Sequence, residues 1–477
     1  MMAHSIPVSA ADDPGAEIVP ADVLDSLVAT CVGRPRAYQA LGQLCDQVGG
    51  RTSGAESGRL AEEWAAGFLS RWGYASPFFE NVPVTCWTRG TCRVEALQPV
   101  GWTLVALAHG NAPTHADVTA QVVDAGHGLT ADYQRLGEAV RGHLALVDEG
   151  SPPGQRLLHR TEKLLLALQA GAAGLLIYSS AAGSLPRTGV CYWNAEAPIP
   201  SLGISQEDGL RLRRLITGGQ APVVRVALEN SITSSTARTV LADLPGSEWP
   251  EQVVLAGAHL DSWDVAQGAV DNGHGVAIVL EAARALAALG RRPRRTIRFV
   301  LWAAEETGLH GSWAYSRGHA ADLARHTAVM NFDMTGDPYG FWLPGRSGAP
   351  GLLRPLAAQL AGLGMTDALD GQAGLHSDHE PFMLAGVPIV GVLGRLEEQQ
   401  GRYYHSTGDT FDKVYQAPLS RASAVAAATL WALADAPQAL FGHLDPPGVR
   451  RMIDEANLYD ALVAGGYDGP PMRVPRT

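Results

Sequence analysis

The stretch HLDSWDVAQGAVDNGHG, residues 259–275, points to both the fold class and the chemistry. Its imidazole and carboxylate groups begin directly after the apolar run VVLAGA (253–258), which is typical of a buried strand. Gly268, Gly273 and Gly275 lie among them, and glycine lets a backbone turn sharply. A strand that ends in potential metal ligands and a tight turn indicates a site at the carboxyl edge of an α/β sheet.

The sequence around this stretch alternates between apolar runs and helical patterns. A sheet with near-continuous apolar strands needs cover on both faces. We therefore predict an α/β domain with a mixed, mostly parallel sheet covered by helices on both faces. The runs that predict its strands are RTVLADLPG (238–246), QVVLAGAHL (252–260), TIRFVLWAAEE (296–306), AVMNFDMTG (328–336) and VPIVGVLG (387–394), and the first helix after the site is GVAIVLEAARALAALG (275–290).

Changes in the periodicity of apolar residues along the chain predict its domains. The beginning lacks periodicity, which is typical of a mobile lead-in. Three amphipathic helical patterns follow, and then a block of short apolar runs around one helical pattern, which predicts an inserted β-rich module. The predicted segments are a mobile N-terminal segment (1–20), the first part of the catalytic domain (21–115), the insert (116–230), the second part of the catalytic domain with the metal site (231–440) and a C-terminal tail (441–477).

Composition excludes several classes of protein. Hydrophobic residues make up 46% and charged residues 18%, as in ordinary globular proteins. The net charge of -12 argues against nucleic acid as a partner, because a phosphate backbone would be repelled. No run of 18 apolar residues predicts a membrane span.

The cysteines and the N-terminus predict a cytoplasmic location. The cysteines are odd in number and scattered, with no CxxC spacing, which is typical of reduced thiols rather than disulfides or a thiolate metal site. The first residues have neither a basic nor an apolar leader region. The cysteines are Cys31, Cys45, Cys86, Cys92 and Cys191.

Ligand-type side chains follow several predicted strands, and we expect them to meet at one edge of the sheet. Imidazoles and carboxylates without a thiolate suit Zn²⁺, Co²⁺ or Mn²⁺. Five ligands and one spare glutamate are the number needed for two ions that share a carboxylate and leave one carboxylate free as a base. These residues are His259, Asp271, Glu305, Glu306, Asp333 and His405.

Each of these residues alone also has an ordinary structural interpretation. Asp271 could cap a helix, and Glu305 and Glu306 could begin one. A metal site is favoured because independent structural roles would have to place such groups at consecutive strand ends by coincidence. Other histidines are expected to be structural or exposed, and Tyr403 and Tyr404 either pack or steady an oxyanion. These other histidines are His310, His319, His326 and His376.

The motifs resemble those of the dizinc metallopeptidases of family M28, and within that family the carboxypeptidase Q group. The resemblance covers about residues 41–436 and implies the zinc exopeptidase fold, interrupted by a protease-associated-like insert at AGAAGLLIYSS (170–180). Asn272 and His274 depart from the usual pattern without removing a ligand, and His274 could alter the rim of the pocket. The motifs are HLDSWDVAQGAVDNGHG, LWAAEETGLHGS (301–312), MNFDMTG (330–336), SDHEPFMLAGVP (377–388), in which Asp378 is the family-like residue, and YYHSTGDT (403–410).

The resemblance also implies a role for each residue of the site. Asp271 would bridge two Zn²⁺ ions, with Co²⁺ or Mn²⁺ as alternatives. Glu305 would act as general base and then acid. Asp261 would accept the imidazole N–H of His259. The further implied ligands are His259 and Asp333 for one ion, and Glu306 and His405 for the other.

The sequence thus predicts a zinc-dependent exopeptidase that hydrolyses small peptides or dipeptides through a water bridged by two metal ions. The insert would wall one side of the site, and the resemblance makes a homodimer one expected assembly. Two alternatives stay open: an aminopeptidase or amidohydrolase that acts on non-peptide amides, and a catalytically dead binding protein on the same fold.

Overall fold

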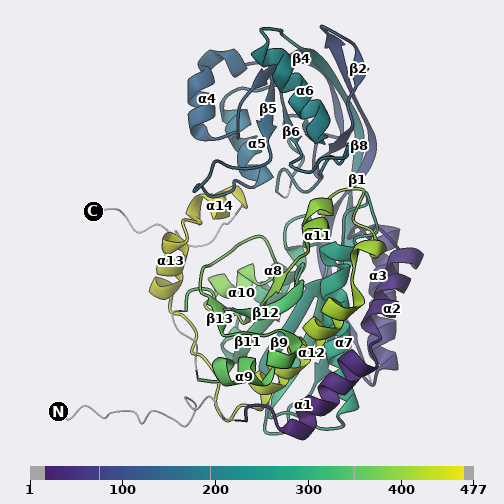
Figure 1. Ribbon diagram of the computed structural model, residues 1–477, viewed down its shortest axis with the longest axis vertical. Helices are drawn as coiled ribbons and strands as arrows, with labels where there is room; N and C mark the ends of the chain where they lie inside the picture. The colour runs from purple at the N-terminus through teal and green to yellow at the C-terminus, as the bar shows by residue number, and fades with distance from the viewer. Residues whose placement is uncertain (1–16, 75, 194, 347–350, 467–477) are drawn as a thin grey trace, which may run out of the picture.

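Two bodies share one continuous sheet in the computed structural model of the protein (Figure 1). Two long strands, β1 (Phe78–Gln98) and β8 (Val223–Leu244), run antiparallel through both bodies. Because their pairing continues across the junction, apart from a register shift between Thr88 and Thr91, a paired ladder joins the bodies. The structure describes residues 17–74, 76–193, 195–346 and 351–466.

The larger body is built on strands that are buried on both faces. Strand β9 (Trp249–His259) lies between β10 (Arg295–Trp302) and β11 (His326–Asn331), and all three are parallel. Strand β10 pairs antiparallel with β8 on its other side. The prediction of a mixed, mainly parallel sheet covered by helices is confirmed.

Five helices cover one face of this sheet. The three helices expected near the N-terminus are present, and the first of them continues into a π-helical turn. Helix α12 is rich in alanine, so its backbone can approach the buried helix α7 closely. The helices are α1 (Ala21–Val28), α2 (Ala37–Gln47), α3 (Glu56–Arg71), α7 (His274–Ala288) and α12 (Gln416–Asp435).

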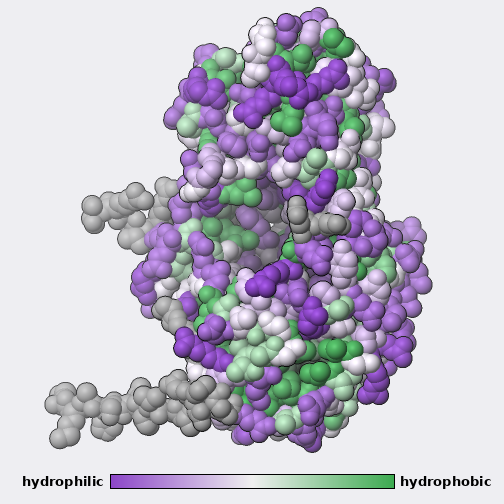
Figure 2. Space-filling view, viewed as in Figure 1, coloured by the Kyte–Doolittle hydropathy of each residue, from purple (hydrophilic) through white to green (hydrophobic). Residues whose placement is uncertain are grey.

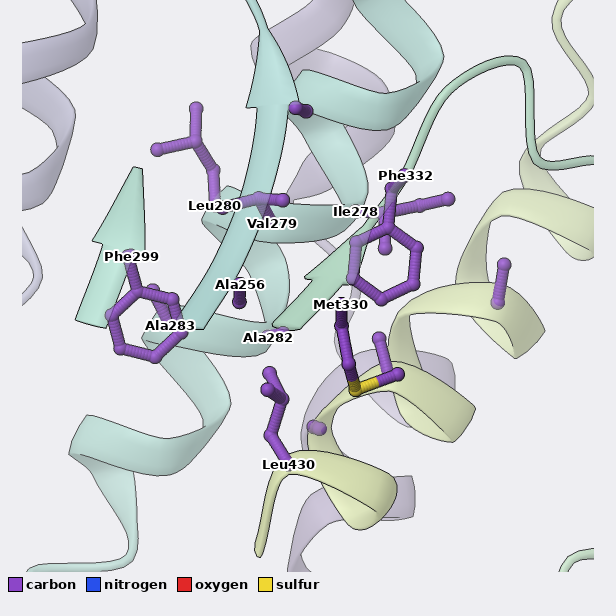
Figure 3. Packing of buried hydrophobic residues seen from close by; sticks show 14 of the residues in the cluster. Ala256, Ile278, Val279, Leu280, Ala282, Ala283, Phe299, Met330, Phe332 and Leu430 are labelled. Atoms are coloured by element: carbon purple, nitrogen blue, oxygen red, sulfur yellow. The ribbon is translucent and has the colours of Figure 1, made fainter. Parts of the chain in front are cut away.

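Side chains from the strands and from α7 interlock in the core between them (Figure 3). Phe299 of β10, Leu280 of α7 and Leu430 of α12 belong to one buried cluster, and none is more than 1% exposed. Removing a buried aromatic ring from such a core costs about 3–5 kcal/mol. This core therefore holds the carboxyl ends of the strands in fixed positions.

The opposite face carries a second core around Trp302, Tyr315 and Phe382. A small three-stranded sheet extends this part of the body beside the strand ends. The further elements of the larger body are α8 (His310–Gly318), α9 (Leu353–Gln359), α10 (Glu380–Leu384), α11 (Glu398–Tyr403) and α13 (Pro446–Glu455), with strands β12 (Asp337–Trp342), β13 (Ala368–Asp370) and β14 (Gly391–Arg395).

Among its described residues, the smaller body contains three α-helices, although only one was expected. Four of its strands, β4 to β7, are parallel neighbours with helices packed against them. The predicted boundaries 115/116 and 230/231 stay predictions. The elements are β2 (Trp102–Thr103), β3 (Ala106–Ala108), β4 (His115–Asp124), β5 (Leu144–Asp148), β6 (Gly174–Tyr178) and β7 (Ser201–Ile204), with α4 (Thr130–Leu136), α5 (Arg160–Gln169) and α6 (Gln206–Thr217).

The predicted segments at the two ends of the chain lie partly outside the described residues. The predicted N-terminal segment 1–20 lies outside the described residues except for 17–20. The predicted tail contains α13 and α14 (Tyr459–Ala464), and α14 contacts α5 of the smaller body. Among the described residues, no helix has the length and apolar character needed to cross a membrane.

Candidate metal centre and active-site cavity

The carboxyl ends of β9, β10 and β11 meet at one cavity of about 500 Å³. His259 is the last residue of β9, while Glu305 and Glu306 lie just after β10 and Asp333 lies just after β11. Parallel strands end at the same edge, which is why residues far apart in sequence converge here. Asp271, from the turn Ala269–Gly273, and His405, from the loop after α11, complete the set on the cavity wall.

The carboxylate of Asp271 lies between the two histidines. Its Oδ1 is 3.3 Å from Nε2 of His259, and its Oδ2 is 3.0 Å from Nε2 of His405. Glu306 Oε2 is also 3.0 Å from Nε2 of His405. On the other side, Asp333 Oδ1 is 3.4 Å and Glu305 Oε2 is 3.9 Å from Nε2 of His259.

The acidic groups and imidazoles perturb one another because they are buried together. Burial raises the pKa of Glu305 well above its usual value and also raises that of Glu306. Burial opposes the charged form of Asp271 too, but hydrogen bonds to both imidazoles keep its pKa low. Burial likewise opposes protonation of His259, yet the charges of Glu305 and Asp333 raise the pKa of that imidazole well above its usual value.

The residues present fit a pair of divalent cations. Glu306 Oε1 is buried and has no hydrogen-bond partner, and an unpaired buried carboxylate oxygen is costly. Clustered carboxylates also repel one another unless positive charge lies between them. The donors are oxygen and imidazole nitrogen without a thiolate, which suits zinc, cobalt or manganese.

Asp261 is buried, is not among the residues that line the cavity, and contacts two parts of the site. Its backbone carbonyl oxygen is 3.1 Å from Nδ1 of His259, whereas its carboxylate is 3.7 Å away. The carboxylate instead accepts the backbone N–H of Glu305 at 3.1 Å and that of Glu306 at 3.4 Å. The nearest acceptor for the imidazole N–H is therefore the carbonyl, and the side chain positions the glutamate turn.

Two residues that the sequence did not single out hold the loop between His259 and Asp271. Arg51 is fully buried, and its guanidinium donates to the carbonyls of Leu260 at 2.6 Å, Gln267 at 2.7 Å and Gly268 at 2.8 Å. The carboxylate of Asp409 accepts the backbone N–H of Val270 at 2.7 Å and of Asp271 at 3.1 Å. The only signals were the position of Arg51 inside the glycine-rich segment GGRTSG (49–54) and that of Asp409 inside YYHSTGDT (403–410), one of the motifs that resemble M28.

Ser377 orients Asp333. Its Oγ donates to Asp333 Oδ2 at 2.6 Å and accepts from Nδ2 of Asn331 at 2.8 Å. Its neighbour Asp378 is fully buried, and burial raises the pKa of that carboxyl to about 8. Ser377 lines the cavity beside Asp333 and therefore fixes the orientation of one of the candidate ligands.

The smaller body forms one wall of the cavity, as Figure 2 indicates by the hollow between the two bodies. The backbone carbonyl of Thr188 lies 3.2 Å from Nδ1 of His405, and Arg160 Nη2 lies 3.1 Å from the same atom. His159 stacks on His376 with 4.5 Å between ring centroids. The insert was predicted to wall the site, but its contact with a candidate ligand was not.

His376 and His274 occupy places that the sequence did not indicate, whereas His326 has a structural position, as expected. His376, expected to be structural or exposed, lines the cavity. His274 is 1% exposed and is not among the residues that line the cavity rim. His326 is buried, and its Nε2 is 2.9 Å from the hydroxyl of Tyr315. Tyr404 lines the cavity, and its ring stacks on His405.

The fold and the donor set define a class, a metal-dependent hydrolase built on an α/β sheet. Comparison with known proteins narrows this class. Residues 239–430 match the model of peptidase family M28, and residues 118–212 match that of the PA domain. Carboxypeptidase Q from Bos taurus is 31% identical over 427 residues, which are 87% of this chain and 89% of that protein.

Two further similar proteins support the same family. The probable lipoprotein aminopeptidase LpqL from Mycobacterium tuberculosis is 33% identical over 320 residues, 60% of each chain. The crystal structure of a peptidase M28 precursor from Shewanella amazonensis has a TM-score of 0.78 and 27% identity, and the match covers 89% of this chain and 98% of that one. The chain belongs to peptidase family M28, and it is a metallopeptidase with carboxypeptidase and aminopeptidase relatives.

The predicted cytoplasmic location is wrong. The relatives, carboxypeptidase Q and the lipoprotein aminopeptidase among them, are secreted, extracellular or lysosomal proteins. The structure explains why the unpaired cysteines did not indicate the correct compartment. Four of the five are buried, and burial raises the pKa of Cys45 and of Cys191 to about 12. Such thiols stay protonated and unreactive, so their lack of pairing does not report the redox state of a compartment.

Proposed function

We propose that the protein is a dinuclear zinc exopeptidase that hydrolyses small peptides or dipeptides. The observation that carries this proposal is the position of Asp271, whose two oxygens face different histidines at 3.3 and 3.0 Å. A carboxylate so placed can serve two ions at once. His259 and Asp333 would hold one ion with it, and Glu306 and His405 the other.

Two bound ions would supply a water of lowered pKa and would polarise the scissile carbonyl. Glu305 is the proton acceptor in this proposal. Three carboxylates face Nε2 of His259, and that of Glu305 is the farthest, at 3.9 Å. At this distance Glu305 would also be able to serve as a metal ligand together with His259 and Asp333. Burial raises the pKa of Glu305, which favours a group that takes up a proton and returns it to the leaving amine.

Tyr404 is placed to assist the same reaction. Burial raises the pKa of its hydroxyl, so the phenol stays protonated and can donate a hydrogen bond. The carbonyl oxygen gains negative charge when the peptide bond is attacked, and a donor fixed in the cavity wall stabilises that charge.

The cavity supports small substrates. Its volume of about 500 Å³ lies within the range for pockets that enclose a small molecule, and the insert closes one side. Zinc is the proposed metal because the donor set suits it, with cobalt or manganese as substitutes. A zinc aminopeptidase from Bacillus subtilis shares the fold, with a TM-score of 0.62 at 24% identity.

Metal content and turnover measured on one preparation test the proposal. The chelated protein should take up about two equivalents of zinc, and the loaded protein should hydrolyse members of a dipeptide panel. A plateau at one equivalent with full activity would contradict the dinuclear centre. Turnover of non-peptide amides alone would favour an amidohydrolase, and no turnover with two tightly bound ions would favour a binding protein. Homodimerisation stays a prediction that sedimentation velocity can test.

A further inference from the structure

The charged side chains that line the cavity differ in whether the proposed function gives them a role. Among the described residues, the lining contains one guanidinium, that of Arg160, and the carboxylates of Asp271, Glu305, Glu306 and Asp333. Under the proposed function, every one of these carboxylates holds a metal ion or carries the reacting proton. No carboxylate in this lining is left to bind the ammonium group of a substrate, whereas the guanidinium has no assigned role.

Arg160 lines two neighbouring cavities. It is the first residue of α5, and with His159 and Tyr404 it separates the catalytic cavity from a second cavity of about 390 Å³ in the insert. A positive helix N-terminus at this point adds to the preference for an anion. The side chain is partly exposed, so a substrate group can reach it.

The charge of Arg160 is not neutralised by an acidic partner. No ion pair is found for it within the part of the chain that the structure describes, whereas nearby Arg187 pairs with Glu149 at 2.8 Å and Arg156 with Glu162 at 2.6 Å. Its Nη1 is instead 3.0 Å from Nε2 of His159. Burial holds the pKa of that imidazole well below its usual value, so His159 is neutral and leaves the positive charge uncompensated.

Arg160 also contacts two neutral groups of the cavity wall. Its Nη2 is 3.1 Å from Nδ1 of His405, and its guanidinium forms a hydrogen bond with the hydroxyl of Tyr404. The same Nδ1 has an alternative partner in the backbone carbonyl of Thr188, 3.2 Å away. Neither contact brings a carboxylate to the guanidinium, so an anionic substrate group would meet no competing acidic partner.

We propose that Arg160 forms the subsite for the free α-carboxylate of the substrate. The protein then acts as a carboxypeptidase or dipeptidase that requires a free C-terminus, rather than as an aminopeptidase. A guanidinium can bind a carboxylate through two parallel N–H···O bonds, which fixes the substrate end and leaves its peptide bond over the catalytic residues. This inference rests on the proposed function, because the roles of the four carboxylates come from it.

The test compares each dipeptide with its C-terminal amide on the zinc-loaded protein. We expect kcat/KM to favour the free acid by about 100-fold, as for a site built to pair a specific charged group. Arg160→Gln should remove most of this preference by raising KM for the acid while leaving the amide nearly unchanged, and Arg160→Lys should restore part of it. Calorimetric titration with leucine and with leucinamide should show the same loss of discrimination without turnover.

The outcomes separate this inference from the proposed function. Arg225→Gln is the matched control, because Arg225 forms an exposed ion pair with Asp117 at 2.7 Å and lines neither cavity. Equal hydrolysis of acid and amide by the unmodified protein would overturn the subsite but leave the peptidase intact. Equal losses on acid and amide in Arg160→Gln, with zinc content unchanged, would also overturn it. Failure to hydrolyse any peptide would instead contradict the proposed function.

Discussion

Glu305 and Glu306 are adjacent in the chain but face different partners, and this difference predicts different mutant phenotypes. Glu305→Gln removes the proton acceptor at constant size, so zinc content should stay normal while kcat falls about 10²-fold to 10⁴-fold. Glu306→Gln changes a carboxylate that lies 3.0 Å from His405, so it should weaken one zinc site, and activity should recover in part at high zinc. Elemental analysis and peptide turnover on the same samples distinguish the two. Loss of zinc from Glu305→Gln, with a normal rate after zinc is restored, would move the base elsewhere.

A variant of Ser377 tests whether a residue outside the proposed ligand set affects the affinity for zinc. Ser377→Ala removes the hydrogen bond to Asp333 Oδ2, so affinity for one zinc ion should fall about 10-fold to 100-fold. Zinc titration with a competing chelator measures this. Ser423→Ala is the control, because Ser423 is also buried but donates to the carbonyl of Leu419 within α12. Unchanged affinity in Ser377→Ala would show that Asp333 needs no such support.

At the scale of an element, the loop between β9 and α7 depends on Arg51. Arg51→Met would remove the guanidinium donor from the carbonyls of Leu260, Gln267 and Gly268, of which only Gly268 keeps a second donor, the backbone N–H of Gly273. We expect the chelated variant to lose about 3 kcal/mol of unfolding free energy, since each buried unsatisfied group is costly. Urea unfolding measures this loss, and zinc titration should show weaker binding because the loop carries the chain from His259 to Asp271. Normal stability would mean that water replaces the guanidinium.

The buried contact between Tyr315 of α8 and His326 of β11 predicts that the free energy of unfolding depends on pH. Burial lowers the pKa of His326 to about 4, whereas the unfolded residue titrates near 6.5. The folded state binds a proton at His326 less readily than the unfolded state does. The neutral imidazole therefore contributes fully to the free energy of unfolding above pH 6.5, and this contribution is lost as the pH falls toward 4. The loss between pH 7 and pH 5 should be about 2 kcal/mol. Urea unfolding of the chelated protein and of His326→Gln at both pH values tests this, and an equal decrease in both proteins would contradict it.

At the scale of the whole molecule, the insert restricts the cavity from one side. Trp193 of the insert lines the cavity and stacks near His376, with 6.5 Å between ring centroids. For a pocket of this size, we expect kcat/KM to fall at least about tenfold from dipeptides to pentapeptides. Trp193→Ala should reduce that difference by admitting longer chains, with dipeptide turnover as the internal reference. Length-independent rates in the unmodified protein would show that the wall does not limit substrates.

The sequence alone predicted the α/β sheet and the residues at the ends of its strands, because strand and helix periodicity are local properties and parallel strands end at one edge. His259, Glu305 and Asp333 could be placed at that edge by this reasoning. Only the tertiary structure decided which groups from distant segments meet them. Arg160 contacts His405 across 245 residues of sequence, and no local spacing encodes such a contact. Arg51 likewise acts through carbonyl groups, which every residue has and which leave no pattern in the sequence.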